Sequence, residues 1–163
     1  MDERSYQLHI IDQLEKNETA LAKLYGAYAR LFPSNKVFWE GLVLDETSHA
    51  RWISTLRRKV EEGEISFGSN RFNIDVINDF AKAVALNFKE AENPLPLVSA
   101  LERAVRLEET MVEKEYFAPF AEDSLDMEIV LSALRYSSIN HLESVRKALM
   151  QEKEMIAKGA ATS

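Results

Sequence analysis

The sequence predicts an all-α fold, a four-helix bundle with one long crossover between its second and third long helices. Glycine and proline are scarce, at five and four of 163 residues, while good helix formers are abundant. Apolar residues recur at helical spacing in four long segments. The connections between these segments are short, long and short, which is the connectivity of a bundle with one crossover. A chain of this length is expected to form a single domain over residues 1–163.

The first two long helices are expected at about residues 4–31 and 35–62. The first ends before Pro33, because a residue that precedes proline is disfavoured in the α region. Ser34 or Asn35 can cap the second helix. Gly63 is a suitable residue to end it. The connection between these helices is so short that they must be antiparallel neighbours.

The crossover is expected at residues 64–93. Its first part, ISFGSNRFN (65–73), has no helical period, and residues 75–90 return to a shorter amphipathic helix. Two prolines, Pro94 and Pro96, follow it. The crossover is about 30 residues long, far more than a tight turn requires, and can therefore traverse the length of the bundle.

The third and fourth long helices are expected at about residues 94–117 and 125–155. Asn93 is the expected cap of the third helix, and Asp123 or Ser124 that of the fourth. Residues 118–124 form the loop between them, and the last residues, GAATS, are expected to fray.

Composition excludes several classes of function. The formal net charge of −7 argues against a nucleic-acid or anionic membrane surface. The chain has no cysteine, which excludes disulfides, thiolate zinc sites, cysteine-ligated iron–sulfur centres and a rubredoxin-type iron site. No apolar run is long enough for a transmembrane helix, and the N-terminal residues lack the apolar region of a signal peptide. We expect a soluble, cytoplasmic protein.

Acids and imidazoles interrupt the apolar faces of all four long helices. They are Glu18, Glu46, His49, Glu108 and His141. Each lies near the centre of its helix, where burial is costly unless the group is paired or bound to a metal. Taken singly, each of these acids can instead be hydrogen-bonded in the core or paired with a histidine. The remaining histidine, His9, falls on the opposite face of its helix and is expected to be exposed.

Together these residues match a known arrangement of ligands. A carboxylate-bridged pair of metal ions in a helical bundle uses one Glu from each of two helices and Glu-x-x-His from each of the other two. Glu46 and His49 form one such pair, and five of the six positions are filled. Oxygen and imidazole donors suit iron or manganese and, less selectively, zinc. Glu115 shares the face of Glu108 and is a spare ligand only if the third helix shifts.

Three segments carry a resemblance to a known family. ETALAKLYGAYARLFP, FWEGLVLDETSHARWI and ALERAVRLEETMVEKEYF resemble the first three helices of the ferritin-like superfamily, in particular its rubrerythrin-type di-iron domains. The resemblance covers roughly residues 10–150. It implies one or two bound iron ions, with Mn or Zn as alternatives, and peroxide scavenging, ferroxidase activity or iron handling. Glu18 and Glu108 would be terminal ligands, Glu46 a bridging or chelating ligand, and His49 and His141 the nitrogen donors.

The fourth helix departs from the family pattern, because Ser138 stands where the second Glu-x-x-His would have its Glu. Three outcomes are open. One metal is held mainly by Glu18, Glu46 and His49, or two metals are bridged by hydroxide or water, or the site has been lost. Tyr25 lies on the same helix face as Glu18. It is either a core tyrosine with a hydrogen-bonded hydroxyl or a radical relay.

Two classes of function follow. If the protein is an enzyme, we expect a di-iron carboxylate oxidoreductase of the peroxidase or ferroxidase type, which needs an external electron donor because the chain has no cysteine. The alternative is a non-enzymatic interaction or structural protein with a lost or structural metal site, such as a single Zn or Mn ion. The resemblance also implies a homodimer or larger assembly, with which the apolar Leu24, Leu44 and Trp52, outside the inward stripes, are consistent.

Overall fold

The computed structural model describes residues 1–114, 116–118 and 123–159 of the chain. It confirms the all-α class: the described residues form helices and no strand. The helices are α1 (Glu3–Leu31), the short 3-10 turn η1 (Pro33–Asn35), α2 (Lys36–Glu61), α3 (Ile74–Glu90), α4 (Leu97–Glu113) and α5 (Leu125–Ala157).

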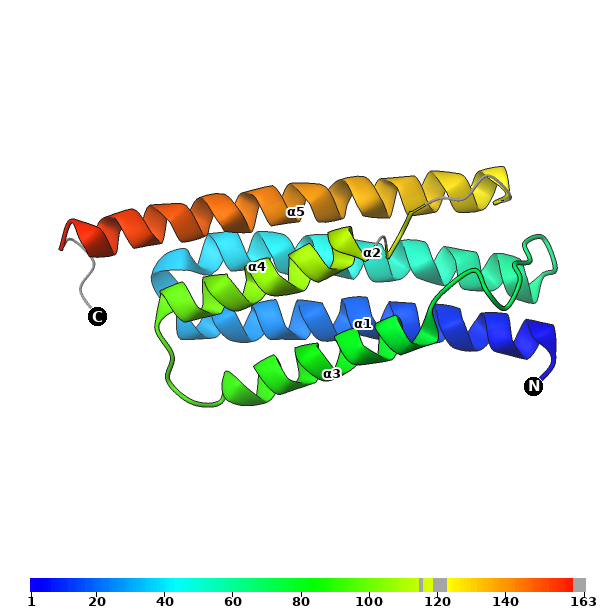
Figure 1. Cartoon of the computed structure of the whole chain (residues 1–163), viewed down its shortest axis with the longest axis horizontal. Helices are drawn as coiled ribbons and strands as arrows, with labels where there is room; N and C mark the ends of the chain where they lie inside the picture. The colour runs from blue at the N-terminus through cyan, green and yellow to red at the C-terminus, as the bar shows by residue number, and fades with distance from the viewer. Residues whose placement is uncertain (115, 119–122, 160–163) are drawn as a thin grey trace.

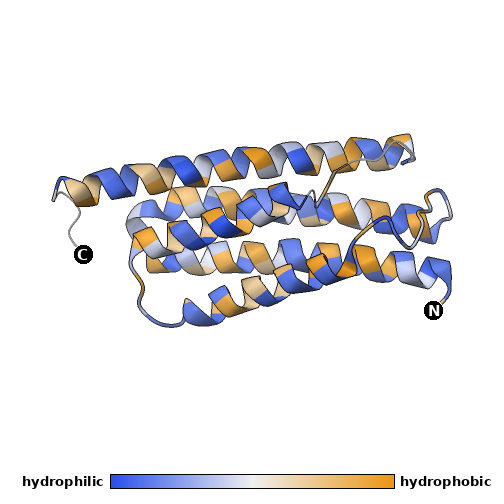
Figure 2. Ribbon diagram, viewed as in Figure 1, coloured by the Kyte–Doolittle hydropathy of each residue, from blue (hydrophilic) through white to orange (hydrophobic). Residues whose placement is uncertain are grey.

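The chain reverses direction at each connection between α-helices (Figure 1), so α1, α3 and α5 run one way and α2 and α4 the other. The most extensive packing joins α1 to α2. α4 packs on α5, while α3 lies against α1 and α4, and α2 also contacts α5. Apolar and polar residues alternate along each helix (Figure 2), as expected of an amphipathic sequence. One contiguous core joins all of these elements.

Local signals in the sequence fix several helix ends. Asp2 caps α1 by accepting the N–H of Ser5 at 2.9 Å. Asn73 caps α3 in the same way, and Ser124 accepts the N–H of Met127 at the start of α5, as predicted. Gly63 follows α2 with φ at +77°, a left-handed conformation that a residue with a Cβ rarely adopts.

The helix predicted at 94–117 differs at both ends, because α4 spans Leu97–Glu113. Pro94 and Pro96 restrict the residues before them, so the helix begins only after Pro96, and Asn93 is not its cap. The N–H of Asn93 instead donates to the carbonyl of Glu90 in the turn that ends α3. Glu115, residues 119–122 of the predicted loop and most of the predicted frayed tail (160–163) lie outside the described residues.

The prediction that Leu24 lies outside the core is wrong, because its side chain is fully buried. α1 is covered on two sides, by α2 and by α3, so a second stripe of α1 is buried as well. Asn17 belongs to this second stripe and donates from Nδ2 to the carbonyl of Ile77 in α3. Leu44 and Trp52 are exposed, by 68% and 40%.

No helix in the described part of the chain combines the length and the apolar composition that crossing a bilayer would demand.

Candidate metal centre

The five residues singled out from the sequence lie in the middle of the molecule, on four helices. Glu18 comes from α1, Glu46 and His49 from α2, Glu108 from α4 and His141 from α5. None of their side chains is more than 3% exposed. Because an isolated buried charge is very costly, such a cluster must satisfy its charges internally or with a cation.

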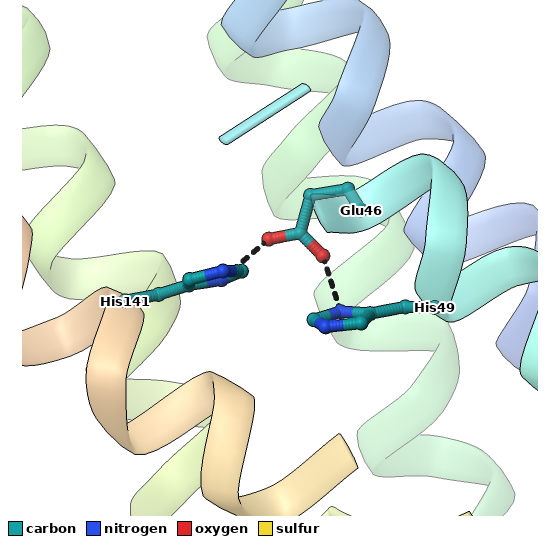
Figure 3. A group of neighbouring side chains, drawn as sticks. All are labelled: Glu46, His49 and His141. Atoms are coloured by element: carbon teal, nitrogen blue, oxygen red, sulfur yellow. Dashed lines mark hydrogen bonds and ion pairs between the residues drawn. The ribbon is translucent and has the colours of Figure 1, made fainter. Parts of the chain in front are cut away.

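Glu46 lies between the two imidazoles (Figure 3). Its Oε2 is 2.8 Å from Nδ1 of His49, and its Oε1 is 2.9 Å from Nδ1 of His141. The two rings are stacked, with centroids 5.3 Å apart. One ligand atom from each of the three residues lies within 4.8 Å of the others, so this buried group could hold a metal ion.

Each imidazole also approaches a second carboxylate. Oε2 of Glu18 is 3.3 Å from Nδ1 of His49. Oε1 of Glu108 is 3.8 Å from Nδ1 of His141. We call these five residues the row: Glu46 is central, and Nδ1 of each histidine faces both Glu46 and one second carboxylate, Glu18 for His49 and Glu108 for His141.

Three further side chains hold this row from outside. Nε2 of His49 donates to the hydroxyl of Ser137 at 2.7 Å. Nε2 of His141 donates to Oδ2 of Asp45 at 3.1 Å. Tyr25 donates its hydroxyl to Oε1 of Glu108 at 2.5 Å, as expected for a core tyrosine with a bonded hydroxyl. Hydrogen bonds on the outer ring nitrogens leave both Nδ1 atoms directed at the centre.

Asp45 and Ser137 were not identified from the sequence. Asp45 directly precedes Glu46 and its side chain is 58% exposed, so its position resembles that of any surface acid. The signal that the sequence offers is that Asp45 directly precedes Glu46. Consecutive side chains of a helix point about 100° apart, so the side chain next to an inward-facing one can reach a neighbouring helix from the edge of the interface. Ser137 could have been found from its place on the inward stripe of the fourth long helix.

Ser138 is buried on α5, but its hydroxyl donates to the carbonyl of Leu134 in its own helix at 2.9 Å. This bond is an ordinary one for serine in a helix and turns the hydroxyl to the backbone. The missing carboxylate is thus not replaced by a serine oxygen directed at the row. His9 is exposed on α1, as predicted.

The electrostatics of the metal-free cluster centre on Glu46. Burial alone would raise its pKa, but the two imidazoles that face its oxygens, His141 and His49, outweigh burial and lower this pKa well below the ordinary value. Burial likewise opposes the charged imidazoles, yet the surrounding carboxylates raise the pKa of His49 to about 10 and that of His141 to about 9. Without metal the centre is a carboxylate between two protonated imidazoles.

The two outer carboxyl groups have the opposite tendency. Burial, reinforced by the charge of Glu46, raises the pKa of Glu18 well above its ordinary range. The same two causes raise the pKa of Glu108 to about 8. Both groups are therefore shifted toward the protonated form, Glu108 so far that it favours this form near neutral pH, and a metal ion would have to displace the bound protons.

Unpaired atoms test whether these residues fit a cation. Four of the buried atoms without a hydrogen bond among the described residues belong to the row: Oε1 of Glu18, Oε2 of Glu108, and the facing Oε1 of Glu46 and Nδ1 of His141. The last two atoms are 2.9 Å apart, but outside hydrogen-bond geometry. Unpaired buried oxygens and an unpaired ring nitrogen on one centre are the donor atoms that a cation requires. The donor set therefore fits a metal ion.

No family model, curated protein or solved structure matches this chain.

Proposed function

We propose that this chain is a ferritin-like, rubrerythrin-like iron protein whose buried centre binds two divalent ions and oxidises Fe(II) with O2 or peroxide. The observation that carries this proposal is the position of Glu46. Its two carboxylate oxygens face different imidazoles, and each imidazole has its own second carboxylate. A row with two equivalent halves suits two ions better than one.

The assignment of ligands follows from this row. Glu46 would be a ligand of both ions. Glu18 and His49 complete one half, and Glu108 and His141 the other, so each ion would have three protein ligands and open positions. In this proposal α1, α2, α4 and α5 are the four helices of a ferritin-like bundle, and α3 belongs to the crossover between its second and third helices.

Three carboxylates do not neutralise two divalent ions, and uncompensated charge is expensive in a core. We propose that a hydroxide or water takes the position that a Glu at 138 would occupy. Oxygen-rich donor sets with two imidazoles suit iron, with manganese and zinc as alternatives. When bound, two Fe(II) ions supply two electrons, which with two protons reduce peroxide to two waters, or O2 to peroxide.

Side chains around the row hold the proposed ligands in position. Asp45 and Ser137 hold the outer nitrogens of the two imidazoles, which keeps Nδ1 of each ring available as a ligand. Tyr25 fixes the carboxylate of Glu108. Trp52 lies beside the ring of His49, with centroids 5.4 Å apart, and is itself partly exposed. Electrons that regenerate Fe(II) must come from an external donor.

Metal titration followed by oxidation tests the proposal. The metal-free protein is titrated anaerobically with Fe(II) and then exposed to O2 or peroxide, while the absorbance of Fe(III) is followed. We expect about two ions per chain and rapid oxidation. Glu46→Ala should abolish both, while Glu40→Ala, at an exposed position of the same helix, should change neither. A wild-type protein that binds no iron, or a Glu46→Ala variant that binds it normally, contradicts the proposal.

A second candidate is a non-enzymatic interaction or structural protein with a lost or structural metal site. It is favoured by Ser138, whose hydroxyl is used by its own helix, and by the ion pairs that already stabilise the metal-free row. This candidate predicts no oxidation chemistry. A purified protein without metal, whose melting temperature is unchanged by iron, would support a lost site, whereas a large stabilisation by Zn without oxidation would support a structural one. For both candidates we propose self-association, which sedimentation would detect.

A further inference from the structure

An apolar cavity lies between α1, α2 and α5, on the side of the centre where α2 ends and α5 begins. Every described residue that lines it is apolar, and all of them are buried except Phe72, which is half-buried. The space open to the centre of a water-sized molecule is about 10 Å3, enough for one such molecule. A cavity without polar partners stays dry and accepts small apolar atoms or molecules.

The cavity begins one helical turn from a proposed ligand on α1 and α2, and one turn from Ser138 on α5. Leu14 precedes Glu18 by one turn of α1, and Ile53 follows His49 by one turn of α2. On α5, Leu134 lines the cavity and its carbonyl accepts the hydroxyl of Ser138. One turn of helix rises about 5.4 Å, so the cavity and the centre are adjacent layers of the same core.

We propose that this cavity is a holding site for O2, from which O2 reaches the metal centre. This inference rests on the proposed function, but the binding step does not depend on metal. O2 is small and apolar and leaves no polar group unsatisfied in such a cavity. Peroxide and water lose their hydrogen bonds there, which costs several kcal/mol for each polar group. The cavity therefore selects O2 over peroxide.

The route from solvent passes Phe72, in the connection that precedes α3. Its ring is half-buried, and the guanidinium of Arg71 lies 4.5 Å from its centroid. Arg71 is in turn bonded to Asp123, ahead of α5, at 2.7 Å. These contacts keep the connection closed over the cavity, so that O2 enters through small movements of Phe72 instead of an open channel.

Xenon binding to the metal-free protein tests the site directly. Crystals pressurised with xenon should show one anomalous peak between Leu14, Ile53 and Leu134. Val60→Phe fills the cavity and should abolish the peak, whereas Val84→Phe, at an equally buried position on α3 away from it, should not. Leu131→Ala enlarges the cavity and should increase xenon occupancy, while Leu101→Ala should leave this peak unchanged. Absence of xenon from both wild type and Leu131→Ala overturns the proposal, even if a filled variant fails to fold.

The Fe(II)-loaded protein tests delivery. Val60→Phe should slow oxidation by O2 several-fold and leave oxidation by peroxide unchanged. Equal rates with O2 in wild type and Val60→Phe, or equal slowing with both oxidants, overturns the role of the cavity in supplying O2. Because xenon is measured without metal, failure of the cavity and failure of the iron site give separate results.

Discussion

A half-exposed carboxylate, Asp45, accepts a hydrogen bond from Nε2 of the buried His141 at 3.1 Å. The opposite nitrogen of this ring, Nδ1, faces Glu46. Asp45 therefore fixes both the orientation of the imidazole and which nitrogen is available to the centre.

We expect Asp45→Asn to weaken metal binding by about ten- to a hundredfold, the usual effect of losing the partner that orients a ligand. The folded protein should survive, because Asp45 is largely solvated. Affinity measured by competition with a chelator checks this prediction, with Asp79→Asn as an exposed control on α3. If both variants bind metal as tightly as wild type, Asp45 is an ordinary surface acid.

Glu46 and Glu18 should respond differently to removal of charge. In the metal-free protein Glu46 is the ionised partner of two imidazoles, so Glu46→Gln leaves them unpaired and should cost about 3–5 kcal/mol of the free energy of unfolding. Burial and the charge of Glu46 shift Glu18 toward its neutral form, which an amide imitates, so Glu18→Gln should cost less, about 1 kcal/mol or below. Urea unfolding near neutral pH measures both. Equal costs would show that Glu46 is not the charged centre of the row.

The metal-free protein should lose stability as pH rises. Folding raises the pKa of His49 and His141 from 6.5 to about 10 and about 9, so their contribution is complete below pH 6.5 and is lost as pH rises through these values. Folding also raises the pKa of Glu108 from 4.5 to about 8, so its contribution to stability is likewise lost as pH rises, over a lower pH range. The native state then binds more protons than the unfolded state throughout this interval.

We expect the free energy of unfolding to fall by at least about 2 kcal/mol between pH 6 and pH 9. Denaturant titrations at several pH values provide the measurement. Glu108→Gln, which cannot ionise, should give a shallower slope. With metal present, stability should instead increase with pH. Metal binding displaces these protons, so the metal affinity increases by about tenfold per pH unit for each proton released. A metal-free protein whose stability increases over this interval would contradict the protonation states described above.

Restoring a carboxylate on α5 should convert the centre to a more strongly binding one. Ser138→Glu completes a second Glu-x-x-His with His141, and we expect tighter binding of two ions per chain, by about tenfold or more. Without metal the same variant should be less stable by about 3 kcal/mol, because it adds a buried acid. Elemental analysis and unfolding measurements check the two effects. Ser132→Glu, at an exposed position of the same helix, should show neither.

The sequence predicted the inward-facing ligand candidates well, because helical periodicity alone decides which side of a helix a residue occupies. Glu18, Glu46 and His141 all interrupt apolar stripes and are buried as expected. The same method placed Leu24 outside the core, since it assumes one buried face per helix, whereas α1 is covered by both α2 and α3.

Helical periodicity was less informative about where helices begin and end, and about residues at the edge of a buried face. The start of α4 was predicted a few residues early because proline is tolerated at the start of a helix. The restriction that Pro96 places on the residue before it was not weighed, and α4 begins after Pro96. Asp45 was missed for a related reason: its partner, His141, is distant in sequence, and a single sequence gives no indication which surface acid reaches across to another helix.

The five-residue row joins four helices that are far apart along the chain. An ion held by it would act as a crosslink from the N-terminal helix to the C-terminal one, so none of these four helices could separate without releasing the ion. Retention of metal would then report the integrity of the entire fold, and its loss under mild denaturation should coincide with global unfolding instead of preceding it.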